Sequence, residues 1–288
     1  MSVNESGVNP MINRIQDKLF NLKSEVLYRA SLVKHRSNLP QLSVGDRFIV
    51  NTLKTEGAYI TSLADLGIDS TPKMLQSAYK QLVRMAAVDN QNLDERLPQI
   101  YTLTDLPEIY NWGNNQRLIN IIENYLGLPV AFHGVHLRKD FPNEHQFGTL
   151  LWHKDSEDRR MVKVIIYLND VEKKHGPFEY IPLSLTSFPN PNAYRVDYKL
   201  WQSGYLGIND EEVEPIIPKS AWKSCPGPAG TVVIADPRTA LHHGTIRTEE
   251  RSALFFVYTT NPPKRPELCT QYWDDTFAKP TVSSSLNS

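Results

Sequence analysis

The stretch Trp152-His153-Lys154-Asp155 decides the fold of this chain, because it carries two potential metal ligands at alternate positions. Side chains on an extended strand repeat their direction every second residue, so His153 and Asp155 would project from one face and could hold one metal ion. A third ligand must then come from elsewhere. The stretch 236–244, which reads Asp-Pro-Arg-Thr-Ala-Leu-His-His-Gly, offers one, and the strand-like run Gly230-Thr-Val-Val-Ile-Ala235 before it could deliver that ligand.

Two imidazoles and one carboxylate on one side of a metal ion leave the opposite coordination positions open. This ligand set is typical of mononuclear non-haem Fe(II) oxygenases, which makes an iron centre the leading hypothesis. His242 and His243 are both available as the third ligand. If His242 binds the metal, His243 would point away from it, since neighbours on a strand alternate faces. The reverse assignment stays open at this point.

An arginine near the second histidine motif suggests how a co-substrate could be held. Arg251 opens the apolar run Ser252-Ala-Leu-Phe-Phe-Val-Tyr258. If the chain reverses near Ile246 and Arg247, His242 and Arg251 fall roughly opposite each other on adjacent antiparallel strands. An arginine in that place can form a bidentate pair with a dicarboxylate bound to the metal.

At these residues the sequence resembles the phytanoyl-CoA dioxygenase-like family of Fe(II)/2-oxoglutarate-dependent oxygenases. The resemblance implies a double-stranded β-helix, which is the jelly roll of cupins. It also implies Fe(II) held by His153, Asp155 and His242, and 2-oxoglutarate held partly by Arg251. After Ile181-Pro182 the family usually continues Gly-Ser-His, whereas this chain has Leu-Ser-Leu. The matching segments are Trp-His-x-Asp at 152–155, the strand 162–168, the turn 176–182, Asp236-x-Arg-x-x-x-His242, and Arg251.

Three further residues are candidates for holding the co-substrate. Lys163 and Tyr167 share one face of the strand 162–168, and either could reach 2-oxoglutarate if that face lines the interior of the barrel. The alternative for Lys163 is a solvated position on the outer face. His136 is the third candidate, because the resembling family uses a polar side chain near this point.

Trp152, Trp201 and Arg238 are the candidate substrate-binding residues. Residues 183–229 separate the two halves of the metal motif, and in this architecture such an insertion normally arches over the mouth of the barrel. Its aromatic residues, Trp201 among them, are therefore candidate substrate walls as well as ordinary packing groups. Arg238 would face the same side as Asp236, and an ion pair that braces the ligand strand is the alternative to a contact with substrate.

The bulk composition is that of an ordered globular protein. Of 288 residues 40% are hydrophobic, and 31 basic and 32 acidic residues give a formal charge of −1. Neither a nucleic acid nor a membrane is indicated as a partner, although a balanced total can hide a local basic patch. Two cysteines exclude a disulfide framework, and no signal peptide or apolar span is evident. A cytoplasmic monomer or homodimer follows as the default.

The order of elements predicts a mainly β protein with flanking helices in one oxygenase domain, 1–288. We expect a helix-rich part at 1–128 that packs on the sheet, a catalytic core at 129–262 with the 183–229 insertion, and a tail at 263–288 that lacks a core pattern. Helices are predicted at 11–33, 71–88 and 115–126, and strands at 46–50 and 57–61. Residues 90–106 are predicted to form a surface connection.

The sequence thus predicts an Fe(II)- and 2-oxoglutarate-dependent dioxygenase that uses O2. It would hydroxylate or otherwise oxidise an unactivated C–H bond of a small molecule, with release of succinate and CO2. A natural product, an amino-acid derivative or a lipid is the expected substrate class. Two alternatives stay open, namely a cupin-type metalloenzyme that does not use 2-oxoglutarate and a non-catalytic β-helix binding protein.

Overall fold

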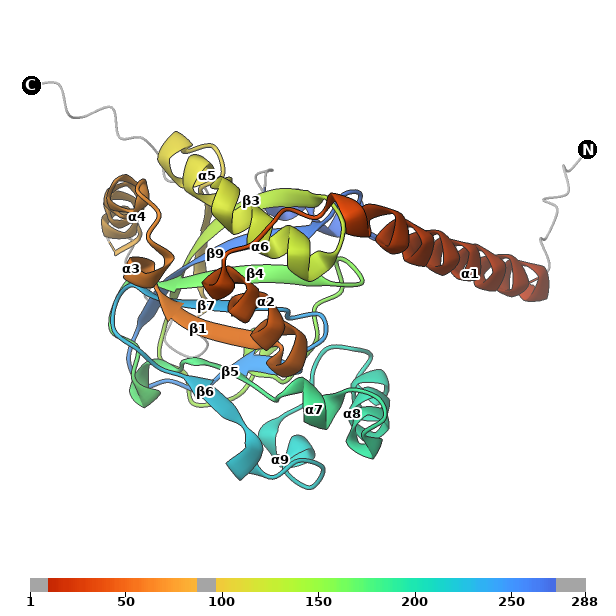
Figure 1. Ribbon diagram of the computed structural model, residues 1–288. Coiled ribbons are helices and arrows are strands. Elements are labelled where there is room, and N and C mark those ends of the chain that lie inside the picture. Colours follow the sequence, from red (N-terminus) through yellow and green to blue (C-terminus); the bar gives the residue numbers. More distant parts are fainter. Residues whose placement is uncertain (1–9, 87–96, 273–288) are drawn as a thin grey trace, which may run out of the picture.

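Two antiparallel sheets face each other across the centre of the protein (Figure 1). The structure is a computed structural model that describes residues 10–86 and 97–272, with side chains from residue 22 onward. Helices flank the larger sheet, and residues from both sheets pack together between them. The predicted class, a mainly β double-stranded β-helix with flanking helices, is confirmed.

The larger sheet has six strands in the order β1-β7-β4-β9-β3-β2, and the smaller has three in the order β6-β5-β8. Strand β4 shows how sequence alternation builds the two layers. Its residues Val162, Val164 and Ile166 face the helices, whereas Ile165 and Tyr167 face the smaller sheet. The strands are β1 Ala58–Ser62, β2 Gln99–Thr102, β3 Val130–Asp140, β4 Met161–Tyr167, β5 Phe178–Tyr180, β6 Lys223–Cys225, β7 Thr231–Ala235, β8 His242–Gly244 and β9 Arg251–Thr260.

The helices α2, α4, α5 and α6 contribute to the core on the outer face of the larger sheet. None of the described helices is long and apolar enough to cross a membrane. The α-helices are α1 Pro10–His35, α2 Val44–Glu56, α3 Leu63–Leu66, α4 Thr71–Ala86, α5 Pro107–Gly113, α6 Gln116–Leu126, α7 Leu183–Thr186, α8 Pro191–Gln202 and α9 Asp210–Val213. The 3-10 helices are η1 Arg36–Asn38, η2 Gly148–Leu150, η3 Lys173–His175, η4 Lys219–Ala221, η5 Pro266–Leu268 and η6 Thr270–Tyr272.

The predicted helices at 71–88 and 115–126 are confirmed as α4 and α6, except that residues 87 and 88 lie outside the described part. Helix α6 begins where the Asn115 side chain accepts a hydrogen bond from the Arg117 amide. It ends at Gly127, which adopts a left-handed φ of 77°. These are the polar N-cap and the glycine C-cap that the sequence suggests.

The strand predicted at 46–50 is wrong, because these residues lie in α2. The Ser43 hydroxyl accepts a hydrogen bond from the Asp46 amide and starts the helix. Ile49 and Leu53, four residues apart, are both buried on one face of the helix. This helical spacing becomes visible only when residues after the five that suggested a strand are included.

The predicted packing of the first helix on the sheet is also wrong for its described side chains. Helix α1 extends away from the rest of the molecule (Figure 1). Leu22, Val26 and Val33 are exposed. Polar contacts hold the C-terminal half of the helix instead, since Glu25 pairs with Arg159 and His35 with Glu123. The other apolar positions of the predicted helix, from Met11 to Leu19, have no described side chains.

The connection predicted at 90–106 contains a strand instead. Residues 90–96 of it lie outside the described part, but residues 99–102 form β2, which pairs with β3 at the edge of the larger sheet. Strand β1 forms the other edge by pairing with β7. The helix-rich N-terminal part therefore supplies both edge strands of the larger sheet.

Candidate active site

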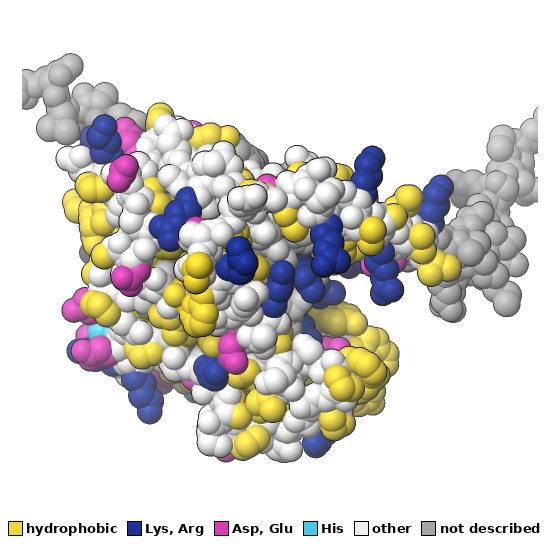
Figure 2. All heavy atoms as spheres, viewed as in Figure 1, with side chains coloured by type: hydrophobic (Ala, Val, Ile, Leu, Met, Phe, Trp, Pro, Cys, Tyr) yellow, Lys and Arg dark blue, Asp and Glu magenta, His cyan; other side chains and the backbone are white. Residues whose placement is uncertain are grey.

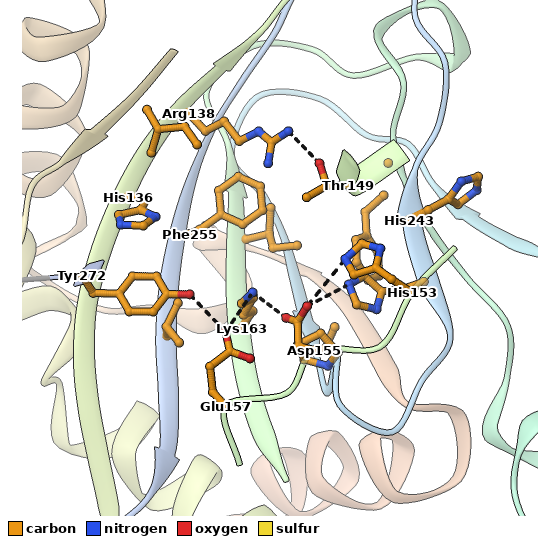
Figure 3. A pocket seen from close by; sticks show the side chains of 18 of the residues that line it. His136, Arg138, Thr149, His153, Asp155, Glu157, Lys163, His243, Phe255 and Tyr272 are labelled. Carbon is orange, nitrogen blue, oxygen red and sulfur yellow. Dashed lines mark hydrogen bonds and ion pairs between the residues drawn. The ribbon is translucent and has the colours of Figure 1, made fainter. Parts of the chain in front are cut away.

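His153, Asp155 and His242 meet in the wall of one cavity, and Figure 3 labels the first two. One possible ligand atom from each of the three lies within 4.8 Å of the others. The Asp155 Oδ1 atom is 3.6 Å from His153 Nε2 and 3.9 Å from His242 Nε2. The structure therefore brings together the three residues that the sequence selected.

The backbone explains why these side chains meet. His153 and His242 exchange two backbone hydrogen bonds of 2.9 and 3.1 Å, which sets them opposite each other as an isolated antiparallel bridge. The Asp155 amide donates to the Pro237 carbonyl at 2.9 Å, so the second half of the motif is tied to the same segment.

Each imidazole also has a fixed orientation. His153 Nδ1 lies 2.7 Å from the Leu151 carbonyl oxygen, and His242 Nδ1 lies 3.2 Å from that of Ala240. A carbonyl oxygen only accepts, so Nδ1 carries the proton and the Nε2 lone pair faces the site. Burial, together with the neighbouring His153, lowers the pKa of His242 to about 3. Both features favour the neutral imidazole that binds a metal.

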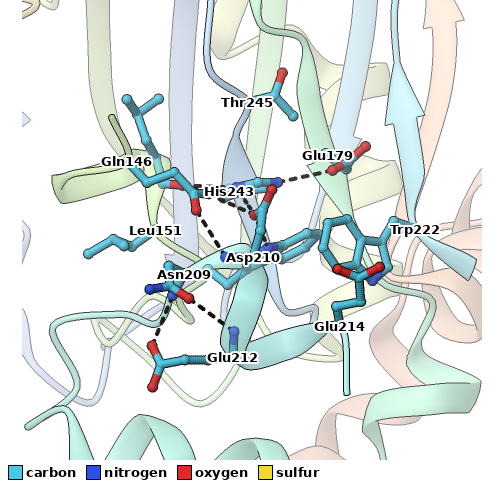
Figure 4. A network of polar contacts seen from close by, with 12 residues as sticks. Gln146, Leu151, Glu179, Asn209, Asp210, Glu212, Glu214, Trp222, His243 and Thr245 are labelled. Atoms are coloured by element: carbon cyan, nitrogen blue, oxygen red, sulfur yellow. Dashed lines mark hydrogen bonds and ion pairs between the residues drawn. The ribbon is translucent and has the colours of Figure 1, made fainter. Parts of the chain in front are cut away.

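His243 is turned away from the triad and lies in a separate polar network (Figure 4). Its Nε2 is 3.0 Å from the Glu179 carboxylate and its Nδ1 is 2.9 Å from the Leu150 carbonyl oxygen. The ring stacks on Trp152 with a centroid distance of 3.8 Å. Of the two neighbouring histidines, the geometry therefore favours His242 as the third ligand.

Lys163 faces the interior and holds the second oxygen of Asp155. Its Nζ atom is 2.5 Å from Asp155 Oδ2, while Oδ1 faces the two histidines. Burial alone would raise the pKa of Asp155, but the Lys163 ammonium outweighs it and holds that pKa below its usual range. The solvated alternative for Lys163 is wrong, because its side chain is 20% exposed and lines the cavity.

An arginine cluster lies in and beside the same cavity, centred on Asp140. The Asp140 carboxylate accepts from Arg251 at 2.8 and 3.1 Å, and it pairs with Arg138 at 2.7 Å and with Arg247 at 2.8 Å. Burial would raise the pKa of Asp140, but the three guanidinium groups hold it far below its usual range. Three cations share one carboxylate, so positive charge remains in excess where a second anion could bind.

Arg251 does not lie opposite His242, as the sequence had suggested. Strand β8 belongs to the smaller sheet and β9 to the larger one, so the chain crosses between sheets at residues 245–250 instead of forming a hairpin. Arg251 nevertheless lines a cavity of about 240 Å³ together with Arg138 and the triad. The sequence therefore predicted that Arg251 lies near the triad, but it predicted the wrong strand pairing.

Comparison with known proteins shows the family of this chain. The family model "Phytanoyl-CoA dioxygenase (PhyH)" matches residues 84–253. The chain belongs to this family. No curated protein matches the sequence.

Solved structures resemble this PhyH family member in fold. EctD from S. alaskensis with bound Fe has a TM-score of 0.55 at 17% identity, covering 78% of this chain and 79% of that one. AviO1 from Streptomyces viridochromogenes Tue57 has a TM-score of 0.52 at 15% identity, covering 77% of this chain and 98% of that one. At these identities the likeness concerns the fold alone.

Of the other candidates for co-substrate binding, His136 lines the cavity of this family member and Tyr167 does not. The His136 ring packs against Tyr272 with a centroid distance of 4.5 Å. The Tyr167 hydroxyl donates to the Cys225 carbonyl at 2.8 Å and accepts from the Phe178 amide at 3.1 Å. Tyr167 therefore joins β4 to the smaller sheet, and we leave it out of the proposed cofactor site.

None of the three candidate substrate residues is among those that line the cavity. Trp152 is fully buried and donates to Asp210 at 2.8 Å, and Trp201 is 61% exposed on α8. Arg238 donates to the Asp155 carbonyl at 3.3 Å. The predicted ion pair between Arg238 and Asp236 is wrong, because the buried Asp236 carboxylate instead accepts from the Tyr125 hydroxyl and from turn amides.

The predicted covering of the mouth by residues 183–229 is likewise not observed. None of these residues is among those that line the cavity. Helices α7, α8 and α9 instead form a lobe, residues 183–222, whose core packs against Trp152 and Leu241 on the outer side of the metal motif.

Residues 271 and 272 of the predicted tail take part in the cavity wall. Tyr272 is 4% exposed, and its hydroxyl approaches Glu157 at 3.4 Å. Tyr272 and Glu157 both line the cavity, and Lys163 lies between Glu157 and Asp155 (Figure 3). Tyr272 is thus buried although the tail lacks a core pattern, and the sequence held no periodic signal that could have found it.

Proposed function

We propose that this protein is an Fe(II)- and 2-oxoglutarate-dependent dioxygenase that hydroxylates, or otherwise oxidises, an unactivated C–H bond of a small molecule. The observation that carries this proposal is the shared cavity, which is lined by the His153–Asp155–His242 triad and by Arg138 and Arg251 of the arginine cluster. A triad without such a cluster would serve many metal enzymes. The cluster adds a place for the dicarboxylate.

The donor set fits Fe(II). Two neutral imidazoles with Nε2 toward the site and one carboxylate oxygen would hold the metal on one side and leave the other positions for co-substrate and O2. When bound, iron and 2-oxoglutarate supply an O2-dependent oxidation that releases succinate and CO2. Membership of the PhyH family supports this chemistry. The similar fold of EctD, whose structure was solved with 2-oxoglutarate and 5-hydroxyectoine, adds support.

The chain's own residues would orient the ligands. Lys163 keeps Asp155 Oδ2 in an ion pair, so that Oδ1 alone is directed at the metal position. Arg251 and Arg138 would hold the distal carboxylate of 2-oxoglutarate. The hydrogen bond from Arg138 Nη2 to Thr149 Oγ1, 2.8 Å long, keeps the Arg138 guanidinium at the cavity wall.

The rest of the cavity wall is mostly apolar and carries a few polar groups. Ile165, Phe255 and Val257 form an apolar surface, while Glu157 and Tyr272 offer a carboxylate and a hydroxyl. An apolar wall excludes water from a reactive site, and a few polar groups orient a small molecule. We propose a natural product, an amino-acid derivative or a lipid as the substrate class.

Anaerobic titration with Fe(II), with and without 2-oxoglutarate, tests the proposal. Wild type should show the weak visible band of the iron–2-oxoglutarate chelate. Asp155→Ala should lose iron binding, and Arg251→Ala should keep iron but need more 2-oxoglutarate to reach the same band. Asp197→Ala, which removes an exposed carboxylate on α8, is the matched control and should behave as wild type.

Two results would redirect the assignment. Iron binding without any band in the wild type would favour a cupin-type enzyme that does not use 2-oxoglutarate. Failure of the wild type to bind Fe(II) would favour a non-catalytic binding protein. If the band appears, succinate formation can be used to screen candidate substrates.

A further inference from the structure

The lobe formed by residues 183–222 carries a dense group of exposed apolar side chains. The inner face of α8 buries Ala193, Val196 and Leu200, which accounts for the folding of the helix. The outer side and the segments next to it expose large aromatic and aliphatic groups that the folding of the lobe does not explain. They are Phe188 (78%), Tyr194 (65%), Tyr198 (56%), Trp201 (61%), Tyr205 (70%) and Leu206 (78%). Such a patch marks an interaction surface.

The backbone conformation of Tyr205 also indicates an interaction surface. It is the only non-glycine residue of the described chain with a positive φ, at 63°. The left-handed region is unfavourable for a bulky side chain, and such strain is concentrated at functional positions. A glycine would fit this backbone better, so a large exposed aromatic group is kept here at a cost to the fold.

Basic side chains border the apolar patch. A cleft of about 860 Å³ is lined by Phe188, Tyr194 and Tyr205 and also by four cations. An adjoining cleft of about 610 Å³ shares Ser187, Phe188 and Thr239 with it and adds two more cations. Figure 2 shows basic side chains gathered in the hollow between the body of the protein and the largely hydrophobic surface of the lobe. The six cations are Lys54, Lys154, Arg159, Arg160, Arg238 and Arg265.

The positive charge of these clefts is poorly neutralised. Asp197 is the one carboxylate among their lining residues, in a protein whose overall charge is −1. Within the described residues, Arg160, Arg238 and Arg265 have no ion-pair partner. Burial and the charge of Arg160 lower the pKa of Lys54, as expected where like charges gather. An anionic partner would relieve this repulsion.

We propose that the lobe and its basic clefts dock on an anionic lipid surface. Aromatic side chains favour the headgroup level of a bilayer, and neighbouring lysines and arginines are attracted by anionic headgroups. Together they make a peripheral contact that needs no membrane-spanning segment. Because Arg238 also donates to the Asp155 carbonyl, docking would hold the metal motif close to the lipid.

The observations favour a lipid surface over two other occupants. A second copy of the chain in a twofold dimer would set the same cationic patch against itself, which like charges oppose. A soluble phosphate compound could occupy the clefts, but Tyr198, Trp201 and Leu206 are not among the lining residues and would remain unexplained. An anionic bilayer accounts for both the charge and the apolar groups.

Vesicle sedimentation combined with tryptophan fluorescence tests the proposal on the full chain. Of the described tryptophans, Trp201 is 61% exposed, Trp222 is half-buried, and Trp112 and Trp152 are fully buried, so insertion should shift the emission of Trp201 to the blue. Wild type should bind phosphatidylcholine vesicles that contain phosphatidylserine, bind those of phosphatidylcholine alone weakly, and release as salt rises. Trp201→Phe should remove the blue shift while most sedimentation is kept.

Further variants separate docking from folding. Arg265→Gln should weaken partitioning about fivefold, the usual effect of one cation at an anionic surface. Tyr205→Gly should weaken binding while it preserves or raises the Tm, which a purely structural role would not produce. Val83→Ser and Lys80→Gln, both on the surface of α4 away from the lobe, are the controls and should bind as wild type.

Three outcomes would overturn the proposal. The first is the absence of binding to phosphatidylserine vesicles. The second is saturable binding of inorganic pyrophosphate, abolished in Arg265→Gln, without vesicle binding, which would assign the clefts to a soluble phosphate compound. The third is a dimer in sedimentation velocity that Tyr205→Gly dissociates. None of these results depends on the oxygenase activity, so docking and the proposed chemistry can fail independently.

Discussion

Replacing Asp140 by asparagine would test the charge argument on which the cofactor site rests. In Asp140→Asn the shape of the side chain is kept, but Arg138, Arg247 and Arg251 lose the carboxylate that they share. The Asp140 and Arg247 side chains are only 2% and 1% exposed, so water cannot replace the lost charge. Three guanidinium groups would then repel one another inside the protein.

The expected magnitude is large. Removing one partner of a buried ion pair costs about 3–5 kcal/mol, because the other charge stays buried and unpaired. For a chain of 288 residues, 1 kcal/mol lowers the Tm by roughly 2 °C, so we expect a fall of about 6–10 °C. Asp197→Asn removes a carboxylate that is 62% exposed and paired with Lys154, and should cost less than about 1 kcal/mol.

Thermal unfolding with added 2-oxoglutarate makes the test specific. The uncompensated arginines of the variant should attract the dicarboxylate, so the ligand should raise the Tm of Asp140→Asn more than that of the wild type. A variant that melts with the wild type, or equal stabilisation of both by the ligand, would refute the idea that excess positive charge defines this site.

The contribution of Asp140 to the free energy of unfolding should decrease as the pH is lowered into the acid range. Because its pKa is depressed in the folded protein, Asp140 contributes stability that is fully present above the ordinary aspartate pKa of about 3.9. This contribution is lost as the pH falls through the folded-state value. The stability difference between wild type and Asp140→Asn should therefore be constant between pH 7 and 5, to within about 0.5 kcal/mol, and shrink only in stronger acid.

Three further predictions concern other parts of the site and core. Lys163→Met removes the ion pair to Asp155 Oδ2 and should weaken Fe(II) binding by about 10–100-fold in a competition titration. An unchanged affinity would show that Lys163 does not orient the Asp155 carboxylate. Gly176→Ala puts a Cβ 2.4 Å from the Thr245 carbonyl oxygen, on a residue whose φ is 67°. The variant should lose about 1–3 kcal/mol of unfolding free energy in a urea titration, and wild-type stability would contradict the prediction. Burial raises the pKa of Cys225 and Cys269 to about 12, so iodoacetamide at pH 8 should modify neither thiol until the protein is unfolded in urea, as measured by intact mass.

Local patterns in the sequence were sufficient for much of the fold and for the triad. The alternation in β4 divided its side chains into the two sets that the structure shows on opposite faces, and Asn115 and Gly127 marked the ends of α6. His153 and Asp155 could be paired because two-residue spacing on an extended segment is a local property. His242 was selected over His243 by its resemblance to the family pattern Asp236-x-Arg-x-x-x-His242, and the backbone bridge to His153 explains why the two histidines meet.

What the sequence could not supply was long-range pairing and charge compensation. The position of Arg251 depends on which sheet β9 joins, and a short connection after His242 suggested a hairpin where the chain crosses between sheets. Arg138, Arg247 and Asp140 carried no motif, since their importance arises only when three separate segments meet. Tyr272 lines the cavity although it follows a proline-rich stretch without apolar periodicity.

The position of β9 has a consequence for how the protein is made. Of the described strands it is the last to leave the ribosome, yet it lies between β4 and β3 in the middle of the larger sheet. Until Thr260 emerges, both neighbours present an unpaired edge, and exposed edges of this kind invite aggregation. A chain that stops before Arg251 should thus accumulate as aggregate and not as a smaller folded domain, which makes completion of translation a condition for folding the sheet at all.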